Sequence, residues 1–115
     1  MFLLAMVLAV PRAASASPDP QPDPALRDQS LRVWYHGAQT TIAARDVMTA
    51  RTEMTIALKN FDKAMYRDHD QKRAADAALR YQRALHDERE AQRRLDTEQA
   101  ALAQAREAFQ QVAGR

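Results

Sequence analysis

Residues 74–112 read AADAALRYQRALHDEREAQRRLDTEQAALAQAREAFQQV and contain neither glycine nor proline. Small or apolar residues recur there in alternating steps of three and four, the spacing that places side chains on one face of an α-helix. The inward positions predicted from this spacing are Ala74, Ala77, Tyr81, Ala84, Glu88, Ala91, Leu95, Glu98, Leu102, Ala105, Phe109 and Val112. At about 1.5 Å per residue the helix spans about 60 Å, so a second long helix is needed to cover its apolar stripe.

The preceding segment has the same spacing. Its predicted inward positions are Leu26, Ser30, Val33, Gly37, Thr40, Ala44, Val47, Arg51, Met54, Leu58, Phe61 and Met65. Extending this stripe past Met65 reaches Asp68 and Lys72 instead of Ala74, so the two stripes differ in phase by two residues. A continuous coiled coil absorbs insertions of three or four residues more readily than two. The chain is therefore predicted to turn between the two stripes.

Folding the chain back around residues 69 and 70 tests this prediction. Facing residues then have numbers that sum to about 139, and bulky side chains meet small ones, as Phe61 meets Ala77. Arg51 falls opposite Glu88, and this pair is predicted to fix the register of the two helices. Thr40 falls opposite Glu98. The predicted fold is all-α, a long antiparallel two-helix hairpin that is coiled-coil-like, alone or dimerised into a four-helix bundle.

The first 16 residues are predicted to be an export signal peptide. An apolar run from Met1 to Val10 is followed by Pro11-Arg12 and by the small residues Ala14-Ser15-Ala16, which fit a signal-peptidase site. No basic residue precedes the run, which leaves an uncleaved N-terminal anchor as the alternative. That alternative needs about 18 apolar residues, and Arg12 interrupts the run well before that length.

Local signals set the remaining boundaries. Residues 17–24 hold four of the five prolines and are predicted to form an extended linker. Asp23 suits a helix N-cap and Pro24 suits the first helical position. The predicted order is export signal 1–16, linker 17–24, first helix 25–67, turn 68–72 and second helix 73–113. Asp68 and Asp70 are the predicted turn or capping residues.

Charge and cysteine content narrow the class of function. Seventeen basic and fifteen acidic residues give a net charge of +2. Arginine and carboxylate residues alternate along residues 87–96 instead of forming a basic surface, so no nucleic-acid partner is predicted. Without cysteine the chain has no disulfide, thiolate metal site or covalent haem attachment. The export signal and the alanine- and arginine-rich composition indicate a bacterial protein that is periplasmic or secreted.

An apolar surface beside the first stripe is the predicted binding site. Leu31, Trp34, Ile42 and Met48 lie next to the inward positions, so the first helix has an apolar face wider than one partner helix covers. Trp34 is the predicted anchor for a protein partner or for a second copy of the chain in a homodimer. Packing of Trp34 within the hairpin itself is the alternative.

The sequence predicts neither catalytic residues nor a metal or cofactor site. It has few serines and no glycine-rich phosphate loop, and its carboxylates alternate with arginine. None of the three histidines falls on a predicted inward position. His86 with Glu90, or the run Asp68-His69-Asp70, keeps a metal- or haem-binding bundle open as an alternative.

Together these features favour an exported, non-enzymatic helical interaction protein. Proteins of this kind include envelope scaffolds, secretion-system accessories and periplasmic chaperones, which act through helix–helix contacts. A membrane-tethered coiled coil with an uncleaved N-terminus is the remaining alternative.

Overall fold

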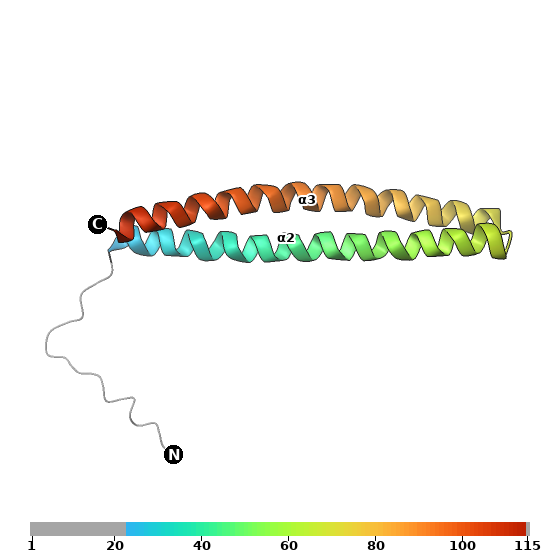
Figure 1. The fold of residues 1–115 in the computed structure, drawn as a ribbon, viewed down its shortest axis with the longest axis horizontal. Coiled ribbons are helices and arrows are strands. Elements are labelled where there is room, and N and C mark those ends of the chain that lie inside the picture. The colour runs from blue at the N-terminus through green and yellow to red at the C-terminus, as the bar shows by residue number, and fades with distance from the viewer. Residues whose placement is uncertain (1–22, 115) are drawn as a thin grey trace, which may run out of the picture.

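The computed structural model describes residues 23–114; the predicted export signal and most of the predicted linker lie outside this range. Helix α2 spans Pro24–Asp62, a single π-helical turn η1 spans Lys63–Arg67, and helix α3 spans Gln71–Ala113. α2 and α3 lie side by side in opposite directions, and residues 23–114 contain no strand (Figure 1). The predicted all-α antiparallel hairpin is confirmed. We call the end where α2 begins and α3 finishes the open end.

Asp23 and Pro24 start α2 as their chemistry predicts. The Asp23 carboxylate accepts a hydrogen bond from the backbone N–H of Ala25 at 2.9 Å, so it satisfies one of the free amides of the first turn. Pro24 is the first residue of the helix, where its missing N–H removes no helical bond.

The turn at the far end is shorter than predicted. Asp68 and Asp70 donate their backbone N–H groups to the carbonyls of Lys63 and Ala64, at 3.0 and 2.8 Å, which closes η1. His69 lies between these two donors and has a φ of 52°, in the left-handed region, where the chain reverses direction. The Asp70 side chain then accepts from the Arg73 amide at 3.1 Å and caps α3. Because of this cap α3 begins at Gln71, two residues before the predicted start, and the predicted turn 68–72 shortens to 68–70.

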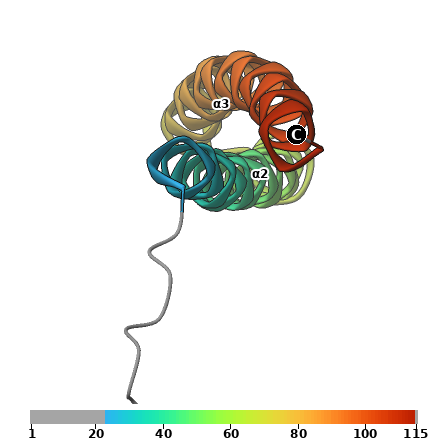
Figure 2. The ribbon, with the colours of Figure 1, turned by 90° about the vertical axis from the view of Figure 1, so that its left-hand side faces the viewer.

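Alanine fills the space between the two helices. We call α2 together with η1 the first arm. Four of its alanines are seven residues apart and buried: Ala43, Ala50, Ala57 and Ala64. The other buried apolar residues of residues 23–114 are Val47, Ala74, Ala77, Ala84, Ala91, Leu102 and Ala105. We call these eleven residues the alanine seam. Side chains this small let two helix backbones approach closely, and the seven-residue repeat winds the helices around each other, as the end view shows (Figure 2).

The predicted stripe of α3 is right, whereas four of the twelve positions predicted for the first arm are displaced by one residue. Every predicted inward position of α3 is buried or half-buried. Four predicted inward positions of the first arm are exposed, and the residue before each is buried or half-buried; the exposed residues are Ser30, Arg51, Leu58 and Met65. Gly37 and Ala44 are half-buried, beside the inward residues His36 and Ala43. The physical reason at Arg51, Leu58 and Met65 is size, because the inward position beside each of them is filled by an alanine, which leaves little space for a larger side chain.

Candidate interaction surface

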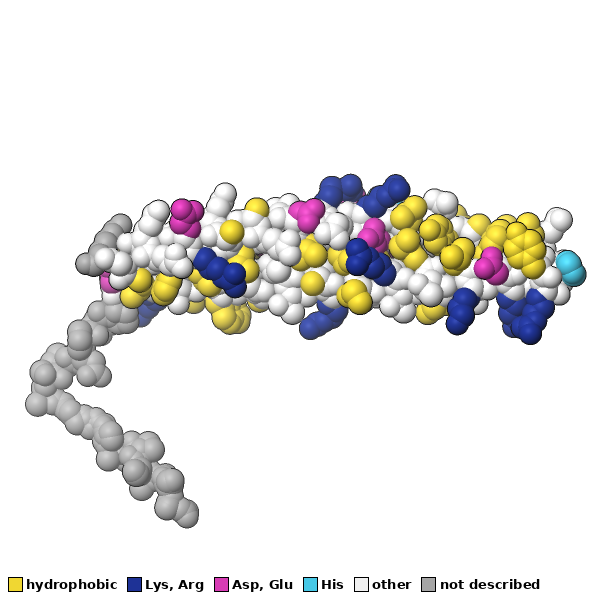
Figure 3. Space-filling view, in the orientation of Figure 1, with side chains coloured by type: hydrophobic (Ala, Val, Ile, Leu, Met, Phe, Trp, Pro, Cys, Tyr) yellow, Lys and Arg dark blue, Asp and Glu magenta, His cyan; other side chains and the backbone are white. Residues whose placement is uncertain are grey.

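Large apolar side chains lie outside the alanine seam, mainly on the first arm. Of the ten exposed large apolar or aromatic residues in the described range, only Leu79 belongs to α3. The others are Leu31, Trp34, Tyr35, Ile42, Met48, Ile56, Leu58, Met65 and Tyr66. Figure 3 shows hydrophobic side chains on one face of the rod, gathered toward the turn end. The surface with most to gain from burial is therefore the outside of the first arm.

All four residues of the predicted binding patch are exposed, but they do not lie on one side. Trp34, at 71% exposed, makes no substantial packing contact within the hairpin. Trp34 and Met48 are two heptads apart and share one side of α2. Leu31 lies on the outermost face, and Ile42 lies on the flank away from Trp34.

A second heptad row runs along the Trp34 side of the first arm. We call it the lateral row of α2; its members are Ser30, Trp34, Gly37, Thr41, Ala44, Met48, Arg51, Thr55, Leu58, Asp62 and Met65. The corresponding lateral row of α3 is Ala75, Ala78, Gln82, Leu85, Arg89, Gln92, Asp96, Gln99, Ala103, Arg106 and Gln110. Together the two rows form the lateral side of the hairpin.

A groove marks where the helices meet on this side. It is lined by Arg51, Met54, Thr55, Leu58 and Tyr81, so α2 and α3 both contribute to it. We call it the lateral groove. Its lining combines apolar walls with a single arginine, which suits an aromatic side chain that inserts there.

The opposite side of the hairpin is rich in charge, and we call it the charged side. Its flanking positions include Arg32, Asp46, Glu53, Arg67, Arg73, Arg80, Asp87 and Arg94. Asp46 accepts from Arg94 across the helices at 2.8 Å. A groove on this side is lined by Glu53, Ile56, Ala57, Asn60, Arg80, Arg83, Ala84 and Asp87. Covering this side with a partner helix would desolvate many ions, which is unfavourable unless each is paired.

The structure brings the predicted register pair together. Arg51 Nε donates to Glu88 Oε2 at 3.2 Å. The arginine side chain is 56% exposed and the glutamate 18% exposed, so water screens one end of the interaction. Although Arg51 lies beside the seam and not in it, its long side chain reaches Glu88 on the facing helix.

A second pair between the helices was not predicted. His36 lies on an inward position, contrary to the expectation that no histidine does, and its Nδ1 lies 2.8 Å from Glu98 Oε1. Thr40, the predicted neighbour of Glu98, instead donates its hydroxyl to the His36 carbonyl of its own helix at 2.7 Å. The signal that identifies His36 is its seven-residue spacing from Ala43, which continues the row of seam alanines.

The two aspartates of the run Asp68-His69-Asp70, which the metal-binding alternative would use as ligands, form ion pairs. The carboxylates of Asp68 and Asp70 lie 3.6 and 3.9 Å from the Arg73 guanidinium. Within residues 23–114 no group of three or more histidine and carboxylate side chains is placed to hold a metal ion. In the same range neither helix has a stretch long and apolar enough to cross a membrane.

Comparisons of this chain with protein-family models, curated proteins and solved structures gave no match. The features of the hairpin that bear on its function are therefore the lateral side, the charged side and the exposed apolar residues.

Proposed function

We propose that this chain is an exported, non-enzymatic helical interaction protein, which binds a protein partner or a second copy of itself through helix–helix contacts. One observation carries the proposal: the hairpin buries alanines, while Trp34, Met48 and Leu58 stand exposed on one side. A protein that folds to bury its apolar surface by itself places such residues in its core.

The energies involved support this proposal. Fully burying a leucine or methionine side chain gains about 1.5–3 kcal/mol, and an aromatic side chain buries still more area. An alanine gains much less, because it adds only one methyl group to the buried surface. Two helices joined by a seam of alanine make a weak independent core, so association supplies stabilisation that the hairpin lacks.

The proposed mode of action is burial of helix faces against other helices. Contact by the lateral rows gives affinity, and the flanking charges orient the partner. Envelope scaffolds, secretion-system accessories and periplasmic chaperones work in this way. Support for a periplasmic or secreted location comes from the predicted export signal at residues 1–16.

Affinity capture from a periplasmic extract tests the proposal. The full chain carries a tag, and wild type is compared with Trp34→Ala and with Tyr35→Ala. Tyr35 is also exposed and aromatic, but it is not in the lateral row, so it is the matched control. We expect wild type and Tyr35→Ala to retain a protein, including untagged copies of the chain, and Trp34→Ala to lose it. Recovery of each variant alone and monomeric would refute the proposal.

A further inference from the structure

The geometry points to a second copy of this chain as the occupant of the lateral side. The copies lie in opposite directions, and Trp34 of each inserts into the lateral groove of the other. This inference rests on the proposed function and specifies its partner, its surface and its orientation. The product is a four-helix bundle in which each α2 contacts the other α2 and each α3 the other α3.

The order of side chains in the lateral row of α2 suits this arrangement. When two copies of the row run antiparallel and are centred at the level of Asp46, four pairs of facing residues between Trp34 and Leu58 have compatible side chains. The facing pairs are Trp34 with Leu58, Gly37 with Thr55, Thr41 with Arg51, and Ala44 with Met48. Large residues meet small ones near the centre, as interdigitated packing requires. Trp34 reaches the lateral groove because Thr55 and Leu58 line it.

The pairing of the α2 rows defines a two-fold axis at the level of Asp46, and the lateral row of α3 is consistent with that axis. The ion pair between Asp46 and Arg94, at 2.8 Å, shows that these two residues lie at the same level along the rod. A two-fold axis at that level places Leu85 of one copy against Ala103 of the other. The axis defined by the α2 rows therefore also places a large side chain of α3 against a small one.

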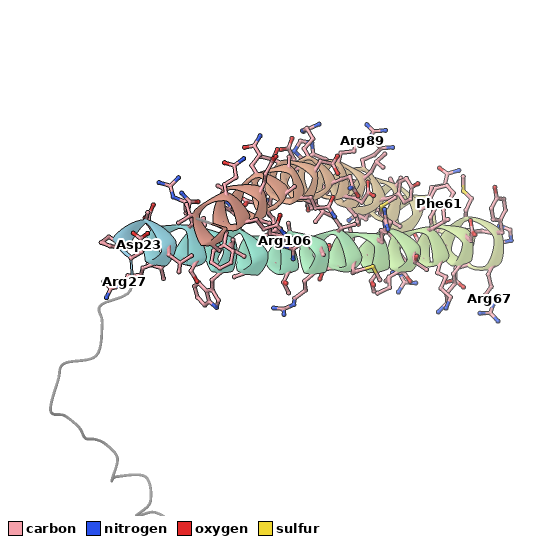
Figure 4. The ribbon with its side chains drawn as sticks, turned by 60° about the vertical axis from the view of Figure 1, so that its left-hand side comes forward. Asp23, Arg27, Phe61, Arg67, Arg89 and Arg106 are labelled. Atoms are coloured by element: carbon pink, nitrogen blue, oxygen red, sulfur yellow. The ribbon has the colours of Figure 1, made fainter. Side chains whose placement is uncertain are left out.

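Charge complementarity favours opposite directions. Arg27 stands near the open end of α2 and Asp62 near its turn end, and two opposed copies bring them within one helical turn of each other. Arg89 likewise comes within one turn of Asp96 of the second copy. Figure 4 shows Arg27 at the open end and Arg89 projecting from α3. In two copies that run in the same direction, Arg27 and Asp62 stay about 50 Å apart and gain nothing.

The area of the lateral side is sufficient for a stable dimer. α2 has 39 residues and is therefore about 58 Å long, and two adjacent helices are about 20 Å wide. The face presented is about 1,000 Å² per copy, whereas a specific dimer buries about 800 Å² on each partner.

Gly37 offers open space at the proposed contact. A Cβ atom added there meets no other atom within 4 Å, so a larger side chain fits the isolated hairpin. In the dimer Thr55 of the second copy occupies that space. Gly37→Leu is therefore expected to keep the hairpin helical and to weaken self-association.

Sedimentation equilibrium of the full mature chain tests whether the lateral side makes the dimer. Leu58→Glu is compared with Ile56→Glu, because these residues are 51% and 52% exposed and lie two positions apart on opposite sides of α2. We expect a dimer whose dissociation constant rises at least about tenfold in Leu58→Glu and changes less than about twofold in Ile56→Glu. Circular dichroism checks that both variants stay helical, and Gly37→Leu supplies a second disruptive variant.

Disulfide crosslinking tests the orientation. In Gly37→Cys/Thr55→Cys the two thiols are eighteen residues apart, about 27 Å along one helix, so a disulfide forms only between chains. The matched control, Gln39→Cys/Glu53→Cys, places thiols at similar levels on the charged side. We expect a covalent dimer from the first variant and little from the control.

Three outcomes overturn the inference. They are a monomer at about 0.1 mM chain, equal weakening by Leu58→Glu and Ile56→Glu, and equal crosslinking of the two cysteine pairs. If the chain is monomeric but wild type still captures another protein that Trp34→Ala loses, the second-copy inference fails and the proposed function stands.

Discussion

The alanine seam and the lateral row differ in side-chain size, although in part of the first arm they are one residue apart. Ala57 is 4% exposed and its neighbour Leu58 is 51% exposed. Ala64 and Met65 repeat the arrangement one heptad later. The more hydrophobic residue of each pair points outward, so hydrophobicity alone does not choose the inward face of this hairpin. Close helix spacing selects the seam residues, and association is the proposed use of the larger ones.

Enlarging a seam alanine should have the largest effect on stability. In Ala57→Leu the added side chain must fit between two closely packed helices, and we expect a loss of about 1–3 kcal/mol in the free energy of unfolding. Ala100→Leu, at an exposed position of α3, is the control and should change it by less than about 0.5 kcal/mol. Urea unfolding followed by circular dichroism measures both. Equal stability of the two variants would mean that the seam is looser than its alanines indicate.

The His36–Glu98 pair is the polar exception within the seam. His36→Leu leaves the half-buried Glu98 carboxylate without its partner, and we expect a loss of about 1–2 kcal/mol. The double variant His36→Leu/Glu98→Leu removes both polar groups and should recover most of that loss. Unfolding of the single and double variants in urea gives the comparison. A double variant no more stable than His36→Leu would show that the pair itself is not the source of the loss.

Adding a methyl group at Gly37, in the lateral row, should stabilise the hairpin, whereas enlarging Ala57 should destabilise it. Gly37→Ala adds a methyl group to open space and removes the backbone freedom of glycine from the unfolded chain. We expect a gain of about 0.5–1 kcal/mol in the isolated hairpin, measured by thermal unfolding at a chain concentration low enough that the protein is monomeric. Destabilisation of the monomer would indicate that the hairpin itself already fills this space.

The Arg51–Glu88 pair joins the lateral row to the seam and should have the smallest effect. A double-mutant cycle with Arg51→Ala and Glu88→Ala should give a coupling energy of about 0.5 kcal/mol at low salt, because the arginine is mostly exposed. The coupling should fall further in 1 M salt, where the screening length is about 3 Å. A coupling energy unchanged by salt would mean that the pair is more buried than its exposure indicates.

The sequence predicts most of the hairpin because its signals are local and mutually consistent. The inward row of α3 is predicted correctly, since alanine alternates there with long charged residues that can only face water. Asp23 with Pro24 predicts the start of α2 from hydrogen-bonding requirements alone. Arg51 meets Glu88 as predicted because a long side chain tolerates an error of one position.

Those same rules fail where small and large apolar residues are neighbours. Choosing Leu58 over Ala57 follows hydrophobicity, but the distance between two helices is a property of the pair and is not visible in either helix alone. The predicted stripe omits His36 because it places the neighbouring Gly37 on the inward position instead. The repeat Ala43, Ala50, Ala57, Ala64 was the available signal. The residues of the predicted patch lie on three different faces of α2, because hydrophobic character alone does not specify heptad position.

The return of the chain to the open end has a consequence for attachment. α2 begins and α3 ends at the same end of the rod, with the turn at the other (Figure 1). In the proposed opposed dimer, the two Asp23 residues would therefore lie at opposite ends, about 60 Å apart. The proposed dimer would therefore keep its two N-terminal attachment points at a distance set by the number of residues in α2.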